Sequence, residues 1–432
     1  MFYLSLLFAR LAYFMLHTTG LSAGTSIIGK FVLKLDPQFL LECNKYIDTK
    51  INVTGTNGKT TTAGLISHLI EGSDKTVVNN AMGANMLTGV VNALSVSLNP
   101  FRKTDYSVIE SDEAYLAKIY DQFEADYLLV TNLFRDQLDR YGELETTKRL
   151  IQDGINKRPN VKLVLNADDP LVASFEGEHK IYYGVENVYY ADESLKAETG
   201  TEEAFNCPCG KPLMYSKKFY AQQGHYFCTC GYKRPDPKYK AEISLYKEYS
   251  VLKVNEESFE VPLVGLFNAY NALGAIALCK ELGIENIIDT LPTFKVAFGR
   301  SEVKHLNGKR VLIQLIKNPI GANEVLKTVD KESNILIIIN DNYADGRDVS
   351  WLWDAEFEFL KNVDKEIVVS GIRANDMALR LKYAGVEKIK IINDIDKAVE
   401  YIGKSADNNI TILPTYTALL HINKMKCLKG NR

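Results

Sequence analysis

Residues 53–61 read Val53-Thr54-Gly55-Thr56-Asn57-Gly58-Lys59-Thr60-Thr61, and this stretch decides the fold of the first half of the chain. It follows the apolar run Ile51-Asn52-Val53 and opens a predicted helix from Lys59 to about Glu71. A strand, a glycine-rich turn and a helix in this order form a phosphate loop, in which backbone N–H groups and the helix N-terminus hold an anion. The sequence therefore predicts a nucleotide-binding domain of the α/β class.

The residue types in this loop fit a nucleoside triphosphate with Mg²⁺. The glycines let the backbone approach the phosphates, Lys59 reaches the terminal phosphate oxygens from an exposed loop, and Thr60 ligates Mg²⁺. Val53 stands where the commoner pattern has its first glycine, so the loop is a shorter form that begins at Gly55. A glycine-rich turn that only caps a helix is the alternative. The predicted nucleotide-binding residues are Gly55, Thr56, Asn57, Gly58, Lys59, Thr60 and Thr61.

Outward from the loop, short apolar runs alternate with helix-length segments, as in a parallel sheet with crossover helices. In the first half the further strand-like runs are Tyr106–Ile109, Tyr127–Val130 and Lys162–Leu165. Residues 200–236 break this rhythm, residues 240–264 alternate as antiparallel strands, and a helix follows from about Asn268. The rhythm restarts after Gly299, with runs at Val311–Ile316, Ile335–Ile339, Ile367–Val369, Lys388–Ile392 and Ile410–Leu413.

Length and composition agree with a globular protein of several domains. The chain has 432 residues, and one domain per roughly 150 residues gives two or three. We expect a helical segment over 1–45, a central ATP-binding domain over 46–298 with an insertion at about 200–236, and a Rossmann-like α/β domain over 299–432. The net charge of −3 provides no basic field for a nucleic acid, so no nucleic acid partner is expected.

The first 16 residues are rich in Leu, Phe and Tyr. Arg10 interrupts the apolar run, no basic segment precedes it, and polar His17 follows before the about 20 residues that a membrane span requires. A signal peptide is therefore disfavoured. We expect a helix packed on the body of a cytoplasmic protein, with an interfacial helix at the inner face of the membrane as the alternative.

Four of the seven cysteines form two pairs, Cys207-Pro-Cys209-Gly and Cys228-Thr-Cys230-Gly, which enclose 18 residues. Two such turns can fold a zinc ribbon around one tetrahedral Zn²⁺. The Cys-x-Cys spacing is tighter than the commoner Cys-x₂-Cys, and a disulfide pair or free thiols are the alternatives. Four thiolates leave no position for a substrate, so the expected role of the zinc is structural.

The short phosphate loop resembles that of the Mur ligase superfamily, and further blocks follow in the family's order. Glu110 ends a strand where the family has an acidic Mg²⁺ ligand, and Lys148 falls near the family's carbamylated lysine, although it also fits an ordinary helix lysine. Residues 131–140 resemble a metal-binding block, but Gln137 replaces the usual His, which puts a second metal ion in doubt. The resemblance implies nucleotide contacts by Asn166, Asp168, Asn268, Asn271 and Arg300.

Two features narrow this resemblance. About 50 residues precede the phosphate loop, too few for the N-terminal domain of about a hundred residues in members that bind a nucleotide sugar. Folylpolyglutamate synthetases share the short start but lack a cysteine module. The polar block 340–354, which holds both Trp residues, the cysteine module, and the stretches 317–319 and 371–373 resemble the branch of the superfamily that amidates lipid II.

This resemblance implies a carbon–nitrogen ligase that uses ATP and Mg²⁺ and carries a structural Zn²⁺. ATP would activate the α-carboxylate of D-glutamate in the lipid II stem peptide as an acyl phosphate, and ammonia would convert it to D-isoglutamine. Cys43, Cys279 and Cys427 lack the sequence context of a glutaminase nucleophile. A GatD-like glutamine amidotransferase subunit is therefore expected to supply the ammonia within a heterodimer.

The resemblance also gives Asp348 a role in the partner, where the corresponding Asp orients a histidine of the glutaminase site. A loop Asp that accepts backbone N–H bonds is the alternative, and Asp354 is the other candidate for the role. The expected catalytic residues are Lys59, Glu110 and Asp348, with Thr60 and Glu110 on Mg²⁺.

Two rival functions remain at this point. A folylpolyglutamate-type or amino-acid-adding ligase would share the ATP site, take an amino acid and need no partner subunit. A zinc-ribbon scaffold with a vestigial nucleotide site would have no activity, but Lys59, Thr60 and Glu110 are all present, which argues against it.

Overall fold

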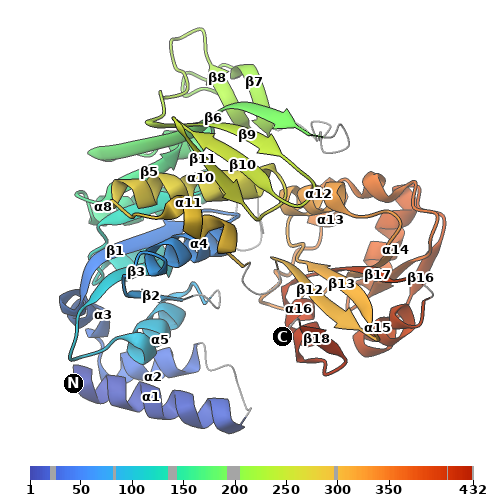
Figure 1. Ribbon diagram of the computed structural model, residues 1–432, viewed down its shortest axis with the longest axis horizontal. Helices are drawn as coiled ribbons and strands as arrows, with labels where there is room; N and C mark the ends of the chain where they lie inside the picture. Colours follow the sequence, from blue (N-terminus) through green and yellow to red (C-terminus); the bar gives the residue numbers. More distant parts are fainter. Residues whose placement is uncertain are drawn as a thin grey trace. The chain divides into compact units, whose positions relative to one another are not determined.

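The computed structural model describes residues 1–19, 26–80, 84–134, 144–191, 205–295, 300–405 and 407–430. The chain divides into two compact units (Figure 1). The first contains Met1–Phe134 and Leu144–Lys295, and the second contains Val296–Arg432.

The first unit is built on a nine-stranded sheet with the order β11-β10-β9-β6-β5-β4-β1-β3-β2. Its strands are β1 (Ile47–Thr54), β2 (Val77–Asn79), β3 (Thr104–Glu110), β4 (Tyr127–Val130), β5 (Lys162–Asn166), β6 (His179–Tyr190), β9 (Tyr239–Leu245), β10 (Ser250–Val254) and β11 (Glu257–Val261). Neighbours from β2 to β9 pair in parallel. β9, β10 and β11 pair antiparallel, as the alternation over 240–264 predicts.

Helices cover both faces of this sheet (Figure 1), and most of them connect its parallel strands. They are α4 (Lys59–Glu71), α5 (Leu87–Ser97), α6 (Leu116–Tyr120), α8 (Leu144–Lys157), α9 (Pro170–Ala173), α10 (Leu266–Glu281) and α11 (Ile287–Thr290). α4 and α10 pack on each other (Figure 1). α4 has the predicted bounds, and α10 begins two residues before the predicted Asn268.

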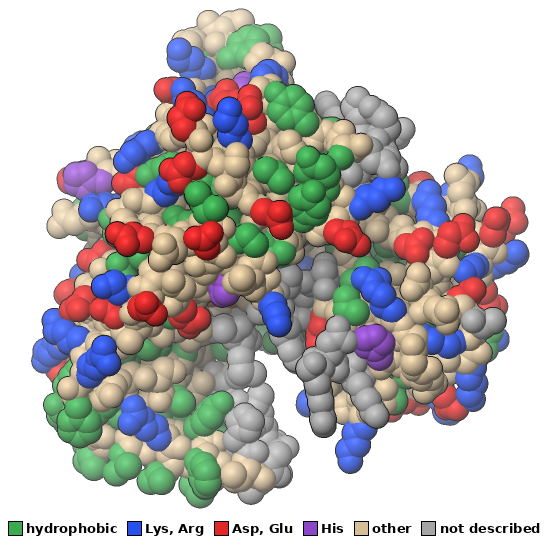
Figure 2. All heavy atoms as spheres, viewed as in Figure 1, with side chains coloured by type: hydrophobic (Ala, Val, Ile, Leu, Met, Phe, Trp, Pro, Cys, Tyr) green, Lys and Arg blue, Asp and Glu red, His purple; other side chains and the backbone are tan. Residues whose placement is uncertain are grey.

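The chain begins with the helices α1 (Phe2–Thr19), α2 (Ile27–Leu35) and α3 (Phe39–Cys43). Phe2, Leu6 and Val32 are buried in the main core of the first unit, so the prediction of an N-terminal helix packed on the body is confirmed. Arg10 donates hydrogen bonds from its guanidinium group to carbonyls at the end of α5. The side of α1 and α2 that faces away from the core is also apolar and lies exposed at the lower left of Figure 2.

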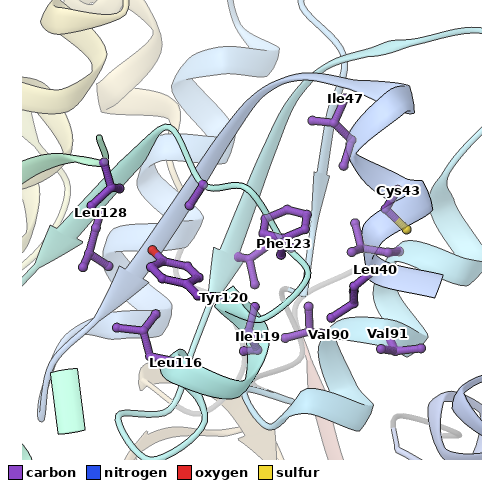
Figure 3. Close-up of a cluster of buried hydrophobic side chains, with 14 of the residues drawn as sticks. Leu40, Cys43, Ile47, Val90, Val91, Leu116, Ile119, Tyr120, Phe123 and Leu128 are labelled. Carbon is purple, nitrogen blue, oxygen red and sulfur yellow. The ribbon is translucent and has the colours of Figure 1, made fainter. Parts of the chain in front are cut away.

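Both faces of the first sheet are buried, which explains why its central strands are almost continuously apolar. On β4, Leu128 belongs to the core that includes Tyr120 and Phe123 (Figure 3). Leu129, the next residue, points to the opposite face and is also fully buried. The polar residues that function requires are therefore confined to the strand ends and to the loops that follow them.

The chain between β6 and β9 forms an inserted module. Its described part, from residue 205, contains the hairpin of β7 (Met214–Tyr220) and β8 (Gln223–Phe227). β6 and β9 are nevertheless neighbours and pair in parallel, with Tyr183 opposite Tyr239. The module thus occupies a crossover connection between two adjacent parallel strands.

The second unit contains a seven-stranded sheet with the order β16-β15-β14-β17-β13-β12-β18. Its strands are β12 (Arg300–Leu306), β13 (Lys309–Gln314), β14 (Asn334–Ile338), β15 (Ile367–Ser370), β16 (Ile389–Ile391), β17 (Asn409–Pro414) and β18 (Leu428–Gly430), and its helices are α12 (Pro319–Thr328), α13 (Trp351–Asp354), α14 (Ala374–Tyr383), α15 (Ile395–Gly403) and α16 (Tyr416–Lys424). The five predicted strands are all present and pair in parallel. β12 and β18, which the sequence did not predict, add an antiparallel edge.

Candidate active site

The phosphate loop leaves β1 and enters α4 through two glycines in the left-handed region. Gly55 has a φ of +123° and Gly58 a φ of +83°. A Cβ atom on Gly55 would lie 2.4 Å from Thr131 Oγ1, and one on Gly58 would lie 2.0 Å from Asn271 Oδ1. Both positions therefore require glycine, for the backbone conformation as well as for the space.

The end of β4 holds this loop in shape. The N–H groups of Thr56 and Asn57 donate to the carbonyl and the side-chain oxygen of Asn132, each over 2.9 Å. Asn132 Nδ2 and Thr131 Oγ1 donate in return to the carbonyl of Asn57 at 3.0 and 2.7 Å. The backbone N–H groups of Thr56 and Asn57 thus bond within the protein, and the loop leads into the N-terminus of α4, where a helix attracts an anion. Thr61 is buried in the first turn of α4.

Lys59 is buried, contrary to the expectation of an exposed loop. Its side chain is only 9% exposed, and its Nζ lies 3.2 Å from Glu113 Oε1, whose side chain is 6% exposed. The ammonium group also donates to the carbonyls of Gly55 and Thr56. Because the loop curls around Lys59, three protein groups hold the lysine charge at the position that a phosphate loop offers to terminal phosphates.

Thr60 and Glu110 meet directly, as the prediction of a shared Mg²⁺ site requires. The Thr60 hydroxyl donates to Glu110 Oε2 over 2.7 Å, and Asn85 Nδ2 donates to Glu110 Oε1 over 3.1 Å. Asn80 holds the backbone of Glu110 through two hydrogen bonds of 2.8 Å. A hydroxyl and a carboxylate oxygen are the hard ligands that Mg²⁺ prefers, so the residues present fit this ion.

Three further predicted residues lie on α10 and at the end of β5. Asn271 touches Gly58, and its Nδ2 donates to Asn268 Oδ1 over 3.4 Å. Asn166 ends β5, and its buried Nδ2 has no hydrogen-bond partner within the described part of the chain. A buried amide that lacks an acceptor costs free energy, so Asn166 marks a place where a ligand oxygen would be favourable. The structure therefore fits a nucleotide at this edge of the sheet.

Asp168 is engaged differently from the predicted nucleotide contact. Its fully buried carboxylate accepts hydrogen bonds from Arg234 Nε at 2.5 Å, Val185 N at 2.7 Å and the Tyr270 hydroxyl at 2.8 Å. Burial raises the pKa of Asp168, while Arg234 and the hydrogen bonds oppose this. Arg234 belongs to the inserted module, so Asp168 fastens that module to the sheet.

Asp169, the next residue, fastens the same module from the other side. It caps α9 and accepts hydrogen bonds from Leu133 N at 3.2 Å and Gln222 Nε2 at 3.1 Å. Burial raises its pKa to about 6.

The four clustered cysteines lie together in the module, as their spacing predicts. Their sulfur atoms all lie within 4.8 Å of one another, with Cys207 and Cys230 3.4 Å apart and Cys209 and Cys228 3.6 Å apart. Four thiolates at about 2.3 Å from a tetrahedral Zn²⁺ would be about 3.8 Å apart, so the cluster has the size of a zinc site.

The two halves of the cluster are built alike. Cys207 N donates to Lys211 O and Cys228 N donates to Tyr232 O, both over 2.7 Å. The glycine after each second cysteine has a positive φ, +83° and +96°. The pKa of the Cys228 thiol falls to about 6, mainly because the Cys230 backbone donates a hydrogen bond to it. No disulfide bond joins any two of the seven cysteines, all of which lie in the described part of the chain.

Asp348 lies in the second unit, in the loop that follows β14. Its side chain is half-buried, and Oδ1 accepts a hydrogen bond of 2.8 Å from Ser350 N. The loop is held by buried Asp345, which accepts from the N–H and the hydroxyl of Thr417 at 2.7 and 2.5 Å. Asp354, the other candidate, is exposed at the end of α13.

The remaining predicted residues are less defined. Lys148 lies half-buried on α8. Gln137 lies outside the described residues, and for Arg300 the structure describes the backbone at the start of β12 but not the side chain.

Comparison with known proteins decides the family. Residues 53–212 match the Mur ligase middle domain, and residues 315–419 match the MurT ligase C-terminal domain. The lipid II isoglutaminyl synthase (glutamine-hydrolyzing) subunit MurT of Staphylococcus aureus (strain COL) is 36% identical over 92% of this chain and 91% of its own. The MurT subunit of Streptococcus pneumoniae (strain ATCC BAA-255 / R6) is 34% identical over 98% and 96%. The chain belongs to the MurT family.

The solved structures that this MurT-family chain resembles share its Mur ligase-like fold. A pseudomurein peptide ligase type C from Methanothermus fervidus superposes with a TM-score of 0.69 at 23% identity, covering 90% of this chain and 80% of that one. The E. coli FolC structure, in complex with DHPP and ADP, gives a TM-score of 0.57 at 15% identity, covering 90% of both chains. At these identities the likeness concerns the fold alone.

Sequence reasoning missed several residues of this MurT-family site. Glu113 pairs with Lys59, Asn132 shapes the phosphate loop, and Asn85 holds Glu110. Glu113 and Asn132 follow strands of a parallel sheet, where polar side chains gather at the carboxyl edge. That signal was available for both, whereas Asn85 stands just before a helix and carries no comparable signal.

Proposed function

We propose that this chain is the ATP-dependent synthetase subunit of a lipid II isoglutaminyl synthase. The observation that carries the proposal is 34–36% identity with MurT subunits over 92–98% of the chain. The direct contact between Thr60 and Glu110, with Lys59 beside it, supports an intact ATP site. The reaction belongs to cell-wall peptidoglycan synthesis.

The chemistry follows from charge. The α-carboxylate of D-glutamate in the stem peptide attacks the γ-phosphorus of ATP, and the bond to ADP breaks to leave an acyl phosphate. Ammonia then attacks the carbonyl carbon, phosphate leaves, and D-isoglutamine results. Bound Mg²⁺ neutralises phosphate charge, while Lys59 and the first N–H groups of α4 hold the phosphate oxygens as two anions approach each other.

We further propose a GatD-like glutamine amidotransferase subunit as the source of ammonia. Exposed aromatic residues flank the loop of Asp348: Tyr343 is 76% exposed and Trp353 is 51% exposed. Aromatic residues of this kind are enriched at protein interfaces. One carboxylate oxygen of Asp348 accepts a hydrogen bond from Ser350 N. The other oxygen would accept a hydrogen bond from the N–H group of a histidine in the partner subunit.

The experiment is amidation of lipid II by the chain together with its partner, with glutamine or an ammonium salt as nitrogen donor and with ATP present or absent. We expect ATP-dependent formation of D-isoglutamine with either donor. A free amino acid should not replace ammonia, and its incorporation would instead identify a folylpolyglutamate-type or amino-acid-adding ligase. Failure of the chain to amidate with any donor would contradict the proposal.

Asp348 is tested in the same assay by Asp348→Asn. The amide keeps the size of the side chain but no longer stabilises an imidazolium. Glutamine-dependent amidation is expected to collapse, whereas ammonium-dependent amidation should persist. Equal losses with both donors would place Asp348 in the synthetase reaction or in folding. Asp354→Asn tests the other candidate, and a loss with glutamine alone in that variant would move the role to Asp354.

We also propose that the cysteine cluster binds one structural Zn²⁺. We propose further that the chain consists of an N-terminal helical segment over 1–45, a central ATP-binding domain over 46–298 and a C-terminal α/β domain over 299–432. The expected role of the zinc is structural, because the four thiolates would fill its coordination sphere. Metal analysis of protein purified without chelator should find about one Zn²⁺ per chain. Absence of zinc from such protein would overturn the assignment.

A further inference from the structure

The outer side of α1 and α2 forms an exposed apolar surface, here called the N-terminal apolar face. Its side chains are between 37% and 67% exposed, as for Phe8 and Phe14. Figure 2 shows these side chains gathered on one edge of the first unit. The face consists of Tyr3, Leu4, Leu7, Phe8, Leu11, Phe14 and Met15 on α1 and Ile27, Phe31 and Leu35 on α2.

Packing against the protein core does not explain why the N-terminal apolar face is apolar. α1 already buries Phe2, Leu6 and Ala9 on its inner side, so the helix is apolar on two sides. The rings of Phe8 and Phe31 meet edge to face with their centroids 6.3 Å apart, which joins the two helices into one continuous surface. Contiguous exposed apolar area of this kind marks an interaction site.

The charges beside the face indicate what covers it. Residues 1–35 contain no Asp or Glu but contain Arg10, Lys30 and Lys34. Since this segment carries +3 and the whole chain −3, residues 36–432 carry −6. Lys34 lies on the face itself, with Nζ 5.9 Å above the ring of Phe31. The segment that carries the apolar face thus has a net positive charge in an otherwise acidic chain, and Lys30 and Lys34 are the cations on α2.

We propose that the N-terminal apolar face docks on the surface of an anionic lipid bilayer. The apolar side chains would enter the boundary between headgroups and acyl chains, and Lys30 and Lys34 would lie at the lipid phosphates. The helices lie along the surface, because none within the described ranges is long and apolar enough to cross a membrane. The inference rests on the proposed function, since it would bring the ATP-binding unit to a substrate that is itself a lipid.

The test is sedimentation of the full chain with vesicles, without ATP and without lipid II. The probes are vesicles of phosphatidylglycerol and phosphatidylcholine in equal parts and vesicles of phosphatidylcholine alone. We expect the chain to bind the anionic vesicles and to bind the neutral vesicles at least tenfold more weakly. Binding to the anionic vesicles should weaken as the salt concentration rises. Lys30→Glu with Lys34→Glu should abolish the preference for anionic vesicles.

The apolar contribution is tested by Leu11→Glu with Phe14→Glu, which should lower binding at least tenfold. The matched control is Tyr189→Glu with Ile288→Glu, which changes side chains of 52% and 48% exposure elsewhere in the first unit and should bind like the wild type. ATP binding by both variants reports that the fold is intact.

Three results would overturn the docking surface. The first is a wild-type chain that stays in the supernatant, and the second is equal vesicle binding by the wild type and the Leu11/Phe14 variant. The third is a wild-type chain that binds no vesicles but forms a dimer, which the Leu11/Phe14 substitutions convert to a monomer. The last result would identify the face as an interface between copies. Vesicle binding in a chain that fails to amidate lipid II would contradict the proposed function and leave the docking surface standing.

Discussion

Replacing Lys59 by alanine tests the phosphate loop and the unexpected burial of its lysine at once. Lys59, the proposed phosphate-binding lysine, is also the cationic partner of Glu113, 3.2 Å away. Lys59→Ala is therefore expected to destabilise the protein as well as to stop ligation. Glu113→Gln in the same chain should restore stability without restoring activity.

The size of the stability loss follows from what Glu113 does when its cation is gone. Breaking a buried pair by removing one partner costs about 3 to 5 kcal/mol. The carboxyl group limits this cost by taking up a proton, which at pH 7 requires about 3.7 kcal/mol for an ordinary pKa near 4.3 at about 1.36 kcal/mol per pKa unit. We expect a loss of about 3 kcal/mol, or a melting temperature lower by about 6 to 10 °C.

The loss of stability in Lys59→Ala should depend on pH in a direction that identifies its cause. Without Lys59, burial would hold the folded-state pKa of Glu113 above its unfolded value, so folding would favour the protonated form. The free energy of unfolding of the variant is then furthest below that of the wild type at a pH above this raised pKa. The difference shrinks as the pH falls toward the pKa of Glu113 in the unfolded chain. Thermal unfolding at pH 8 and pH 5.5, in the absence of nucleotide, measures both limits.

Activity is followed separately, with an ammonium salt as nitrogen donor. The single and the double variant should both lose at least tenfold in rate, which corresponds to about 1.4 kcal/mol of barrier. A deficit that grows toward acid pH, or one that Glu113→Gln leaves unchanged, would refute the account of the Lys59–Glu113 pair. Retained activity in Lys59→Ala would refute the loop as the ATP site.

Three other perturbations test separate parts of the structure. Gly58→Ala forces a side chain into φ +83° and against Asn271, so it should cost about 1 to 2 kcal/mol and weaken ATP binding, and a titration with unchanged affinity would contradict this. Arg234→Met leaves the buried Asp168 carboxylate without its cation, at about 3 to 5 kcal/mol, and adding Asp168→Asn should recover most of the melting temperature. Cys228→Ser should lower zinc content and thermal stability while the KM for ATP stays unchanged, and a normal metal content would contradict the cluster assignment.

The local sequence was sufficient to predict those elements whose backbone conformation is determined by one short stretch of residues. α4 and β4 have the predicted bounds, Lys59–Glu71 and Tyr127–Val130. The positive φ angles of Gly55 and Gly58 explain why the turn between β1 and α4 was recognisable from residue types alone. The meeting of the four cysteines was likewise predicted from their spacing.

Contacts between distant residues were not predictable in this way. Glu113 lies 54 residues from Lys59, and Arg234 lies 66 residues from Asp168. A carboxylate after a strand has no local signal that distinguishes a solvated side chain from one half of a buried pair. Lys59 was therefore expected on an exposed loop, and the bond between Asp168 and the inserted module was not predicted.

The placement of the cysteine module between β6 and β9 has a consequence for biosynthesis. The ribosome completes the module before it makes β9 and α10, and α10 supplies the Asn271 that packs on Gly58. β6 and β9 can pair in parallel only when the connection between them has folded back across the sheet. The module that forms this connection has little core of its own without metal. With zinc bound as proposed, its supply during translation should therefore set how many newly made chains become competent for ATP, while those already folded keep their turnover rate.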